Sequence, residues 1–137
     1  PGPGDAAIVN SATNLRVIAR AIEFYSNENR GRAPINFGLL HETQDVPAQT
    51  FVNPRVSSDV PPAGMTPEQT AAWINARTDY VYLAAGKSLS RFDGENVIAY
   101  ENPADGAIGI NLLFGDGRVE FREMRWALET LARPLPL

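Results

Sequence analysis

An Asp-Gly pair between two short runs of alternating apolar residues constrains the fold of this chain most. The pair is Asp116-Gly117, and the runs are residues 110–114 and 119–121. Asp-Gly favours a tight two-residue turn, because such a turn requires positive φ at both central positions. The sequence therefore predicts an antiparallel hairpin whose turn motif is Asp116 and Gly117.

The alternation predicts one apolar side for this hairpin. Side chains of a strand point to opposite faces in turn. The apolar set comprises Ile110, Leu112 and Phe114 on the first strand and Val119 and Phe121 on the second. The residues between them, Arg118, Glu120 and Arg122, are expected to face water. Such a hairpin needs another element to cover its apolar side.

A helix near the start of the chain is the expected cover. From Asp5 to about Asn29, apolar residues recur at spacings of seven, three, four and three. They are Ile8, Leu15, Ile18, Ile22 and Tyr25, which draw one stripe along a helix. Asp5 suits the N-cap position, and Gly31 suits a left-handed conformation after the last turn.

The rest of the chain reads as an irregular middle followed by strands. Residues 35–65 lack periodicity, apart from a helical turn at 37–40 and an extended pair at 51–52. Thr66-Pro67-Glu68-Gln69 forms a capping box that starts a helix to Arg77. Strands are expected at 80–83 and 97–100, and a short helix from Glu123 to Ala132. Trp73 on the helix after Thr66 and Trp126 on the last helix are expected to be core anchors.

This order predicts an α+β fold, in which a long N-terminal helix packs on an antiparallel sheet of about four strands. The 137 residues and their hydrophobic content of 44% suit one domain, residues 1–137, with residues 1–4 as a linker or cloning remnant. The net charge of −4, with scattered basic residues, argues against a nucleic-acid partner. The chain has no cysteine, which excludes disulfides and thiolate chemistry.

Three segments resemble the type IV pilin-like proteins, and specifically the G-like pseudopilins of type II secretion. Residues 14–29 with Gly31-Arg32-Ala33-Pro34 are similar to the second half of a pilin helix. Residues 79–83 are similar to the Ser-Tyr-x-Tyr strand of those proteins. Residues 97–101 followed by 111–121 are similar to their Asn-x-Leu-Phe-x-Asp-Gly-x-Val-x-Phe ending, which is the most specific of the three motifs.

The chain departs from that family pattern in three respects. Gly106 stands where the group often has a histidine, ten positions before Asp116, and the helix lacks the cysteine often found before the Asn-Leu pair. The cleavage motif and the apolar first half of the helix are also absent from the sequence. The resemblance implies a pilin-like fold and a membrane-anchored precursor whose anchoring segment of about 20 apolar residues precedes this chain.

The residues favour no enzyme. A hydrolase needs a nucleophile, a base and a group that orients them, and no such spacing occurs. The single histidine, His41, has no spaced partner and suits a surface or packing role. Gly115-Asp116-Gly117 is too short for a nucleotide site, and a hairpin turn explains it.

Acidic loop residues are the one candidate metal site. Asp93, Glu95 and Asp105 offer the hard oxygen ligands that Ca²⁺ takes, and the resemblance implies calcium binding in a loop of the β-region. The spacing matches no strict calcium loop, and Asp93-Gly94 and Asp105-Gly106 are also ordinary turn pairs. We therefore expect no cofactor and keep calcium as the alternative.

The resemblance assigns a function of assembly. It implies a structural subunit of a pilus-like or pseudopilus fibre, on the periplasmic or extracellular face, whose partners are other pilin-like subunits and the secretion or pilus machinery. The candidate partner interface on the helix is Ile8, Val9 and Leu15. The alternative is a stand-alone binding module of the same fold, with a ligand or partner held between residues 35–65 and the sheet.

Overall fold

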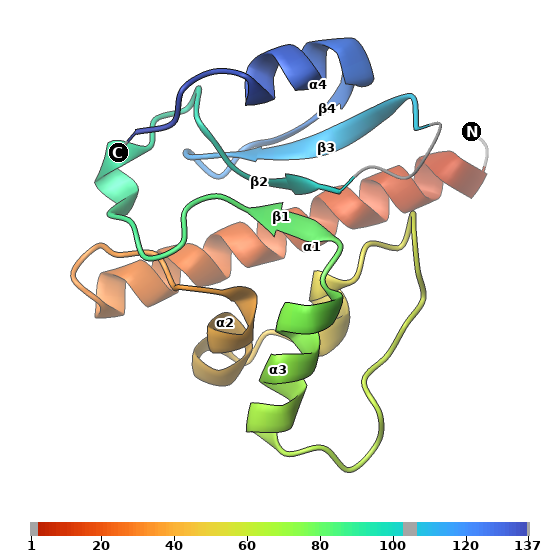
Figure 1. Ribbon diagram of the computed structural model, residues 1–137, viewed down its shortest axis with the longest axis vertical. Helices are drawn as coiled ribbons and strands as arrows, with labels where there is room; N and C mark the ends of the chain where they lie inside the picture. The colour runs from red at the N-terminus through yellow and green to blue at the C-terminus, as the bar shows by residue number, and fades with distance from the viewer. Residues whose placement is uncertain (1–2, 103–106, 137) are drawn as a thin grey trace.

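The computed structural model describes residues 3–102 and 107–136, which form a long helix, a four-stranded sheet and three shorter helices. Helix α1 (Pro3–Glu28) crosses one face of the sheet, and α4 (Met124–Leu131) covers the other. Helices α2 (Phe37–Gln44) and α3 (Pro67–Arg77) pack together on the α1 side (Figure 1). The expected α+β arrangement of a long amino-terminal helix and an antiparallel sheet is confirmed.

The sheet is an antiparallel meander in the order β1-β2-β3-β4. Its strands are β1 (Tyr80–Tyr82), β2 (Val97–Glu101), β3 (Gly109–Phe114) and β4 (Val119–Glu123). A bulge between Val97 and Ala99 shifts the register of β2 against β3. Because of this bulge, Val97 contacts the α4 side while Ile98 and Ala99 contact the α1 side.

The turn between β3 and β4 differs from the predicted one. Phe114 pairs with Arg118, so three residues form the loop: the N–H of Phe114 donates to the carbonyl of Arg118 at 2.8 Å, and that of Gly117 to the carbonyl of Phe114 at 2.9 Å. Only Gly117 has positive φ, +88°, and Asp116 does not. This is a one-residue bulge at Gly117 rather than a two-residue turn.

The longer loop moves the two apolar sets of the hairpin to opposite faces. A one-residue change of register turns every side chain of a strand to the other side of the sheet. Leu112 therefore pairs with Glu120, and Asn111 with Phe121. The prediction of one apolar side was wrong: Ile110, Leu112 and Phe114 lie under α4, whereas Val119 packs with the core on the α1 side.

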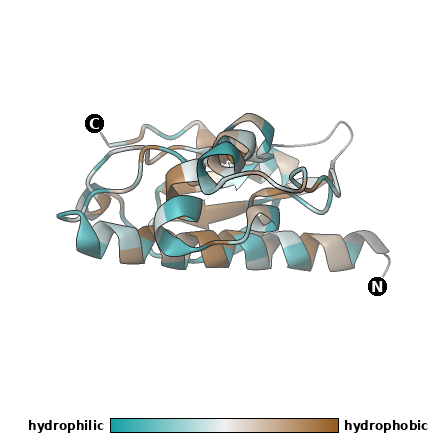
Figure 2. Ribbon diagram, turned by 90° about the horizontal axis from the view of Figure 1, so that it is seen from below, coloured by the Kyte–Doolittle hydropathy of each residue, from teal (hydrophilic) through white to brown (hydrophobic). Residues whose placement is uncertain are grey.

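Helix α1 forms as predicted but covers the other face of the hairpin. Its buried stripe of Leu15, Ile18 and Ile22 packs on Ile98, Ala99 and Leu113. Along the ribbon of α1, hydrophobic and hydrophilic bands alternate (Figure 2), which fits a helix buried along one side. The helix begins at Pro3, so Asp5 lies in its first turn and is not the N-cap. Gly31 has the expected left-handed conformation, with φ of +79°.

The middle of the chain contains more regular structure than predicted. Helix α2 extends four residues beyond the predicted turn at 37–40, to Gln44, and Asn36 caps it by accepting a hydrogen bond from the Leu39 N–H at 2.9 Å. A 3₁₀ turn, η1 (Ala48–Phe51), includes Phe51, so only Val52 of the predicted pair is extended. The capping box at Thr66 and the end of α3 at Arg77 are confirmed. A second 3₁₀ turn, η2 (Leu89–Arg91), precedes β2.

Candidate functional site

A buried carboxylate, Glu101, is the centre of the largest polar cluster beneath α1. Glu101 ends β2 and is 0% exposed. Its Oε2 accepts hydrogen bonds from Ser11 Oγ at 2.7 Å and from Asn53 Nδ2 at 2.8 Å. Its Oε1 accepts from Arg55 Nη1 at 2.7 Å and from the backbone N–H of Asn111. Four donors therefore replace the water that an ionised carboxylate loses on burial.

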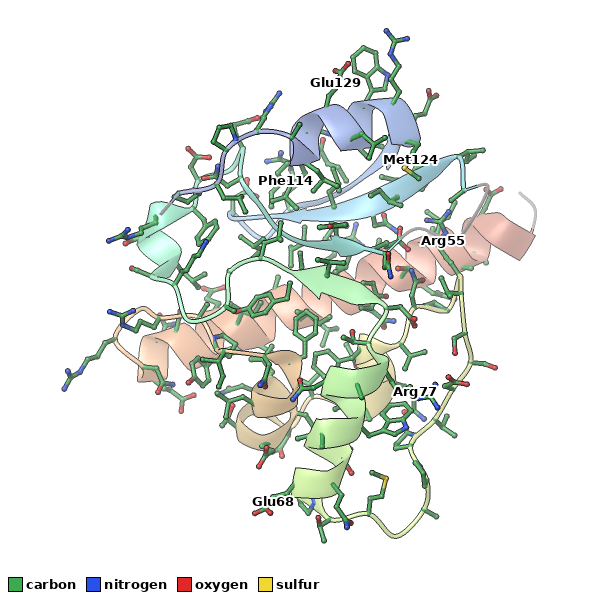
Figure 3. All side chains as sticks on the ribbon, viewed as in Figure 1. Arg55, Glu68, Arg77, Phe114, Met124 and Glu129 are labelled. Atoms are coloured by element: carbon green, nitrogen blue, oxygen red, sulfur yellow. The ribbon has the colours of Figure 1, made fainter. Side chains whose placement is uncertain are left out.

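Arg55 is the counterion of Glu101. Its Nη1 also donates to the carbonyl of Gly109 at 3.1 Å, and its guanidinium lies 5.4 Å from the ring centre of Phe121. Arg55 comes from the segment between η1 and α3, and its side chain is 16% exposed. In Figure 3 it lies beside the amino-terminal half of α1. The ion pair and these contacts thus hold the segment between η1 and α3 against the start of β3 and against β4.

A hydrogen-bonded chain continues from Glu101 into α1. Because the only hydroxyl proton of Ser11 is donated to Glu101, Tyr80 donates to Ser11 Oγ across 3.0 Å. Asn14 Nδ2 donates to Tyr80 Oη at 3.4 Å and to the carbonyl of Val52 at 3.2 Å. Burial raises the pKa of Tyr80 to about 12, although its hydrogen bonds with Ser11 and Asn14 oppose that rise. Tyr80 therefore keeps its proton at neutral pH.

This network fastens the amino-terminal half of α1 to the sheet. Asn111 Nδ2 adds a hydrogen bond to the carbonyl of Ile8 at 3.0 Å. Within the described residues, every buried side-chain nitrogen and oxygen has a partner. A catalytic carboxylate needs a free oxygen facing a substrate, and Glu101 has both oxygens occupied. The arrangement is suited to holding α1 at a fixed angle.

Two of the three candidate calcium ligands, Asp93 and Glu95, are used in other contacts. Asp93 Oδ1 accepts from the Glu95 N–H at 2.8 Å, which is a local turn, and Glu95 Oε2 lies 3.5 Å from Arg133 Nη1. Asp105 lies outside the described residues. Across residues 3–102 and 107–136, no group of three acidic or histidine side chains could hold a metal ion. His41 Nδ1–H donates a hydrogen bond to the carbonyl of Val46 at 2.7 Å.

The candidate interface residues of α1 have different surroundings. Leu15 is 0% exposed and belongs to the core, so it is not accessible to a partner. Ile8 is half-buried, and Val9 is 60% exposed. Two further apolar residues of α1 are exposed, Val17 at 40% and Phe24 at 57%. The sequence stripe pointed to the buried side, and these three exposed residues form a second, outward set.

Two open grooves border α1. One, of about 490 Å³, lies between the carboxyl-terminal half of α1 and the β3–β4 turn; Arg16 and Arg20 line it together with Asp116 and Gly117. Asp116 accepts from the Arg118 N–H at 3.0 Å and from Arg118 Nη1 at 2.9 Å, so its carboxylate stabilises the turn. The other, of about 330 Å³, lies between α1 and residues 49–60.

Sequence reasoning missed the Glu101 network. Its residues come from α1, the segment after η1, and three strands, at separations of up to 103 positions along the chain. One signal was available: Glu101 is a charged residue directly after the apolar run Val97-Ile98-Ala99-Tyr100. Alternation does not show which face such a residue takes once a bulge intervenes.

Comparison with protein-family models, with curated proteins and with solved structures finds no match. Over the described part of the chain, none of the helices combines the length and apolar character needed to span a membrane.

Proposed function

We propose that this chain is the globular part of a structural subunit of a type IV pilus-like or type II secretion pseudopilus assembly. It acts by polymerising through α1, and it carries out no catalysis. The long helix on an antiparallel meander and the carboxyl-terminal hairpin motif support this proposal, together with the resemblance of residues 14–29, 79–83 and 111–121 to pilin-like proteins.

The exposed side of α1 is the observation that carries the proposal. At 1.5 Å per residue, the 26 residues of α1 extend about 39 Å. Val9, Val17 and Phe24 are spaced by eight and seven residues, which places them on one side of the helix, away from the core. A helix that is buried on one side and carries apolar residues on the other has a surface for neighbouring subunits.

The proposal includes a location and partners. The subunit would stand on the periplasmic or extracellular face, held at the inner membrane by a preceding segment. Its partners would be other pilin-like subunits and the secretion or pilus machinery. The codons upstream of this chain give the first check: about 20 consecutive apolar residues are expected, and a charged upstream sequence would contradict the proposal.

Charged residues on the outward side of α1 test the polymerisation directly. We expect Val17→Glu combined with Phe24→Glu, introduced into the complete gene, to abolish sedimentable fibres, because each fibre contact would bury an unpaired carboxylate. Circular dichroism of the purified variant should match the wild type, since both positions are exposed.

Leu128→Glu serves as the matched control. Leu128 is about as exposed as Phe24 but lies on α4, which covers the face of the sheet opposite to α1. Fibres should persist in this variant. Normal fibre yield with both α1 substitutions would contradict the proposal.

A ligand-binding module remains the second candidate, and the groove of about 330 Å³ beside residues 49–60 is where it would bind. The lining includes Asn10, Asn14, Gln49, Ser57 and Asp59, so a polar small molecule would fit its chemistry. The groove lies against α1 and not against the sheet, where the sequence placed it.

A further inference from the structure

Strand β4 is the open edge of the sheet. The order of the strands leaves β1 and β4 at the two edges. Strand β1 has only three residues, and the chain that follows it pairs with residues after α1: Arg32 and Ser88 form a bridge, and the Ala33 N–H donates to the carbonyl of Lys87 at 2.8 Å. No described segment pairs with the outer side of β4. An uncovered edge is a template for another strand.

The backbone groups that point outward from β4 can be identified. The carbonyl of Arg118 accepts from Phe114, and the N–H of Met124 donates to Ile108, both at 2.8 Å. In an antiparallel pair, the residues that bond to the neighbour alternate with those that point away. The N–H and C=O groups of Val119 and Phe121 therefore point outward, and within the described chain they have no backbone partner.

The side chains of β4 are complementary to a second copy of the same strand. We infer that β4 pairs antiparallel with β4 of another copy, about a two-fold axis at Phe121. In this register Glu120 of each copy lies opposite Arg122 of the other, and the two Phe121 residues exchange both backbone hydrogen bonds. Opposite charges directly across an antiparallel pair stabilise it, whereas like charges oppose it.

A groove beside the edge is open to the same occupant. It has a volume of about 520 Å³ and lies between β4 and α4, where Trp126 contributes apolar surface and Arg122, Glu123 and Glu129 contribute charge. Trp126 is 51% exposed, so its predicted role as a core anchor was wrong, whereas Trp73 packs partly buried against the core. A second β4 strand would cover this groove. Its pairing would give one continuous sheet of eight strands, four from each copy.

This dimer goes beyond the proposed function, because it uses β4 and leaves the outward side of α1 free. Sedimentation equilibrium of the chain, from roughly 10 µM to 1 mM, measures it. We expect a transition from 14.9 kDa to twice that mass, with a dissociation constant on the order of 100 µM, since so short an interface is at the small end of stable contacts. A monomer throughout that range would overturn the inference.

Charge variants identify the register. Glu120→Arg gives four opposed cations across the two-fold axis, and Arg122→Glu gives four opposed anions, so each variant alone should be monomeric. Mixed together, they should form a heterodimer, because each arginine of the first then faces a glutamate of the second. Dimerisation of either variant alone, or no association of the mixture, would overturn the register.

Arg122 also donates a hydrogen bond to Thr130 Oγ1 at 2.6 Å, so replacing it could unfold the chain. A disulfide cross-link tests the same pairing without changing either charged residue. The two Cα atoms of a hydrogen-bonded antiparallel pair lie about 5.5 Å apart, within the range of a disulfide. The chain has no cysteine, so Phe121→Cys introduces a single thiol. Mild oxidation should link it into a dimer.

Phe24→Cys is the matched control for that cross-link. Phe24 is exposed on the outward side of α1, far along the helix from the Glu101 network. Efficient linking at Phe24 with none at Phe121 would assign self-association to α1 and overturn the dimer through β4. Linking at Phe121 with none at Phe24 would support the dimer through β4 and would leave the fibre test of α1 unaffected. The two proposals can therefore be contradicted independently.

Discussion

The two faces of the sheet are covered in chemically different ways. The face under α4 is a small apolar cluster of Val97, Ile110, Leu112, Phe114 and Ala127. The face under α1 has a larger apolar core, but the amino-terminal half of the helix rests on the Glu101 network. Figure 3 shows Phe114 beneath α4 and Arg55 on the other side of the sheet, beside α1.

The two helices are therefore held to the sheet by different interactions. Apolar burial is non-directional, so α4 needs only a matching surface to dock. The hydrogen bonds of Glu101 have fixed directions, so they select one angle and one register for α1. A helix that must present a regular outward side to neighbours benefits from such a selection.

The largest loss of folding stability is expected for a substitution in the apolar cluster under α4. Phe114 is fully buried under α4, and the guanidinium groups of Arg118 and Arg122 lie 4.3 and 4.9 Å from its ring centre. Phe114→Ala should lower the free energy of unfolding by about 3–5 kcal/mol, because it leaves a cavity and removes both cation–π contacts. Urea unfolding followed by circular dichroism measures this. Leu128→Ala, exposed on α4, should change it by less than about 1 kcal/mol.

A somewhat smaller effect is expected on the polar face. Glu101→Ala leaves Arg55 and the donors on Ser11, Asn53 and Asn111 without an acceptor, and should cost about 2–4 kcal/mol in the same assay. Glu101→Gln keeps one acceptor oxygen and should cost less.

A double-mutant cycle sharpens that result. If Arg55 is buried chiefly as the counterion of Glu101, Arg55→Ala in the Glu101→Ala background should cost less than it does alone. Strictly additive losses would show that the two side chains stabilise the fold independently.

The smallest effect concerns the pH dependence of the α1 face. Because burial raises the pKa of Tyr80 from its ordinary 10.0 to about 12, folding favours the protonated hydroxyl. That stabilisation is complete below pH 10 and is lost as the pH rises through 12. Between pH 9 and pH 11 the wild type should lose about 1 kcal/mol more than Tyr80→Phe, measured by urea unfolding at each pH. Equal losses in both proteins would contradict a protonated, buried Tyr80.

Local patterns predicted the elements better than their pairing. The capping box at Thr66 fixes the start of α3 within a few neighbouring residues, and the stripe of Leu15, Ile18 and Ile22 fixes the buried side of α1. The predicted two-residue turn was wrong because Gly115 is also part of the loop. A Cβ at position 115 would lie 2.5 Å from the carbonyl oxygen of Asp93, so a segment distant in sequence packs directly against this glycine. One residue of loop length then reversed the faces of β4.

The candidate site was less predictable than the fold. The resemblance predicted Val9 as an interface residue, and Val9 is exposed. Val17 and Phe24 are exposed too, but an apolar stripe shows only which residues are buried against something, so it did not indicate them. The partners of Glu101 were hidden for another reason. Each is an ordinary polar residue in its local sequence, and only the packing of α1 on the sheet brings them together.

The sequence by itself determined that this chain forms a long amino-terminal helix and an antiparallel sheet ending in a hairpin, since periodicity, caps and glycines act over a few residues. Tertiary structure alone decided which face each helix covers, where Glu101 is buried and which edge of the sheet stays open. Those outcomes depend on loop length, a bulge and contacts across as many as 103 positions, which no local pattern contains.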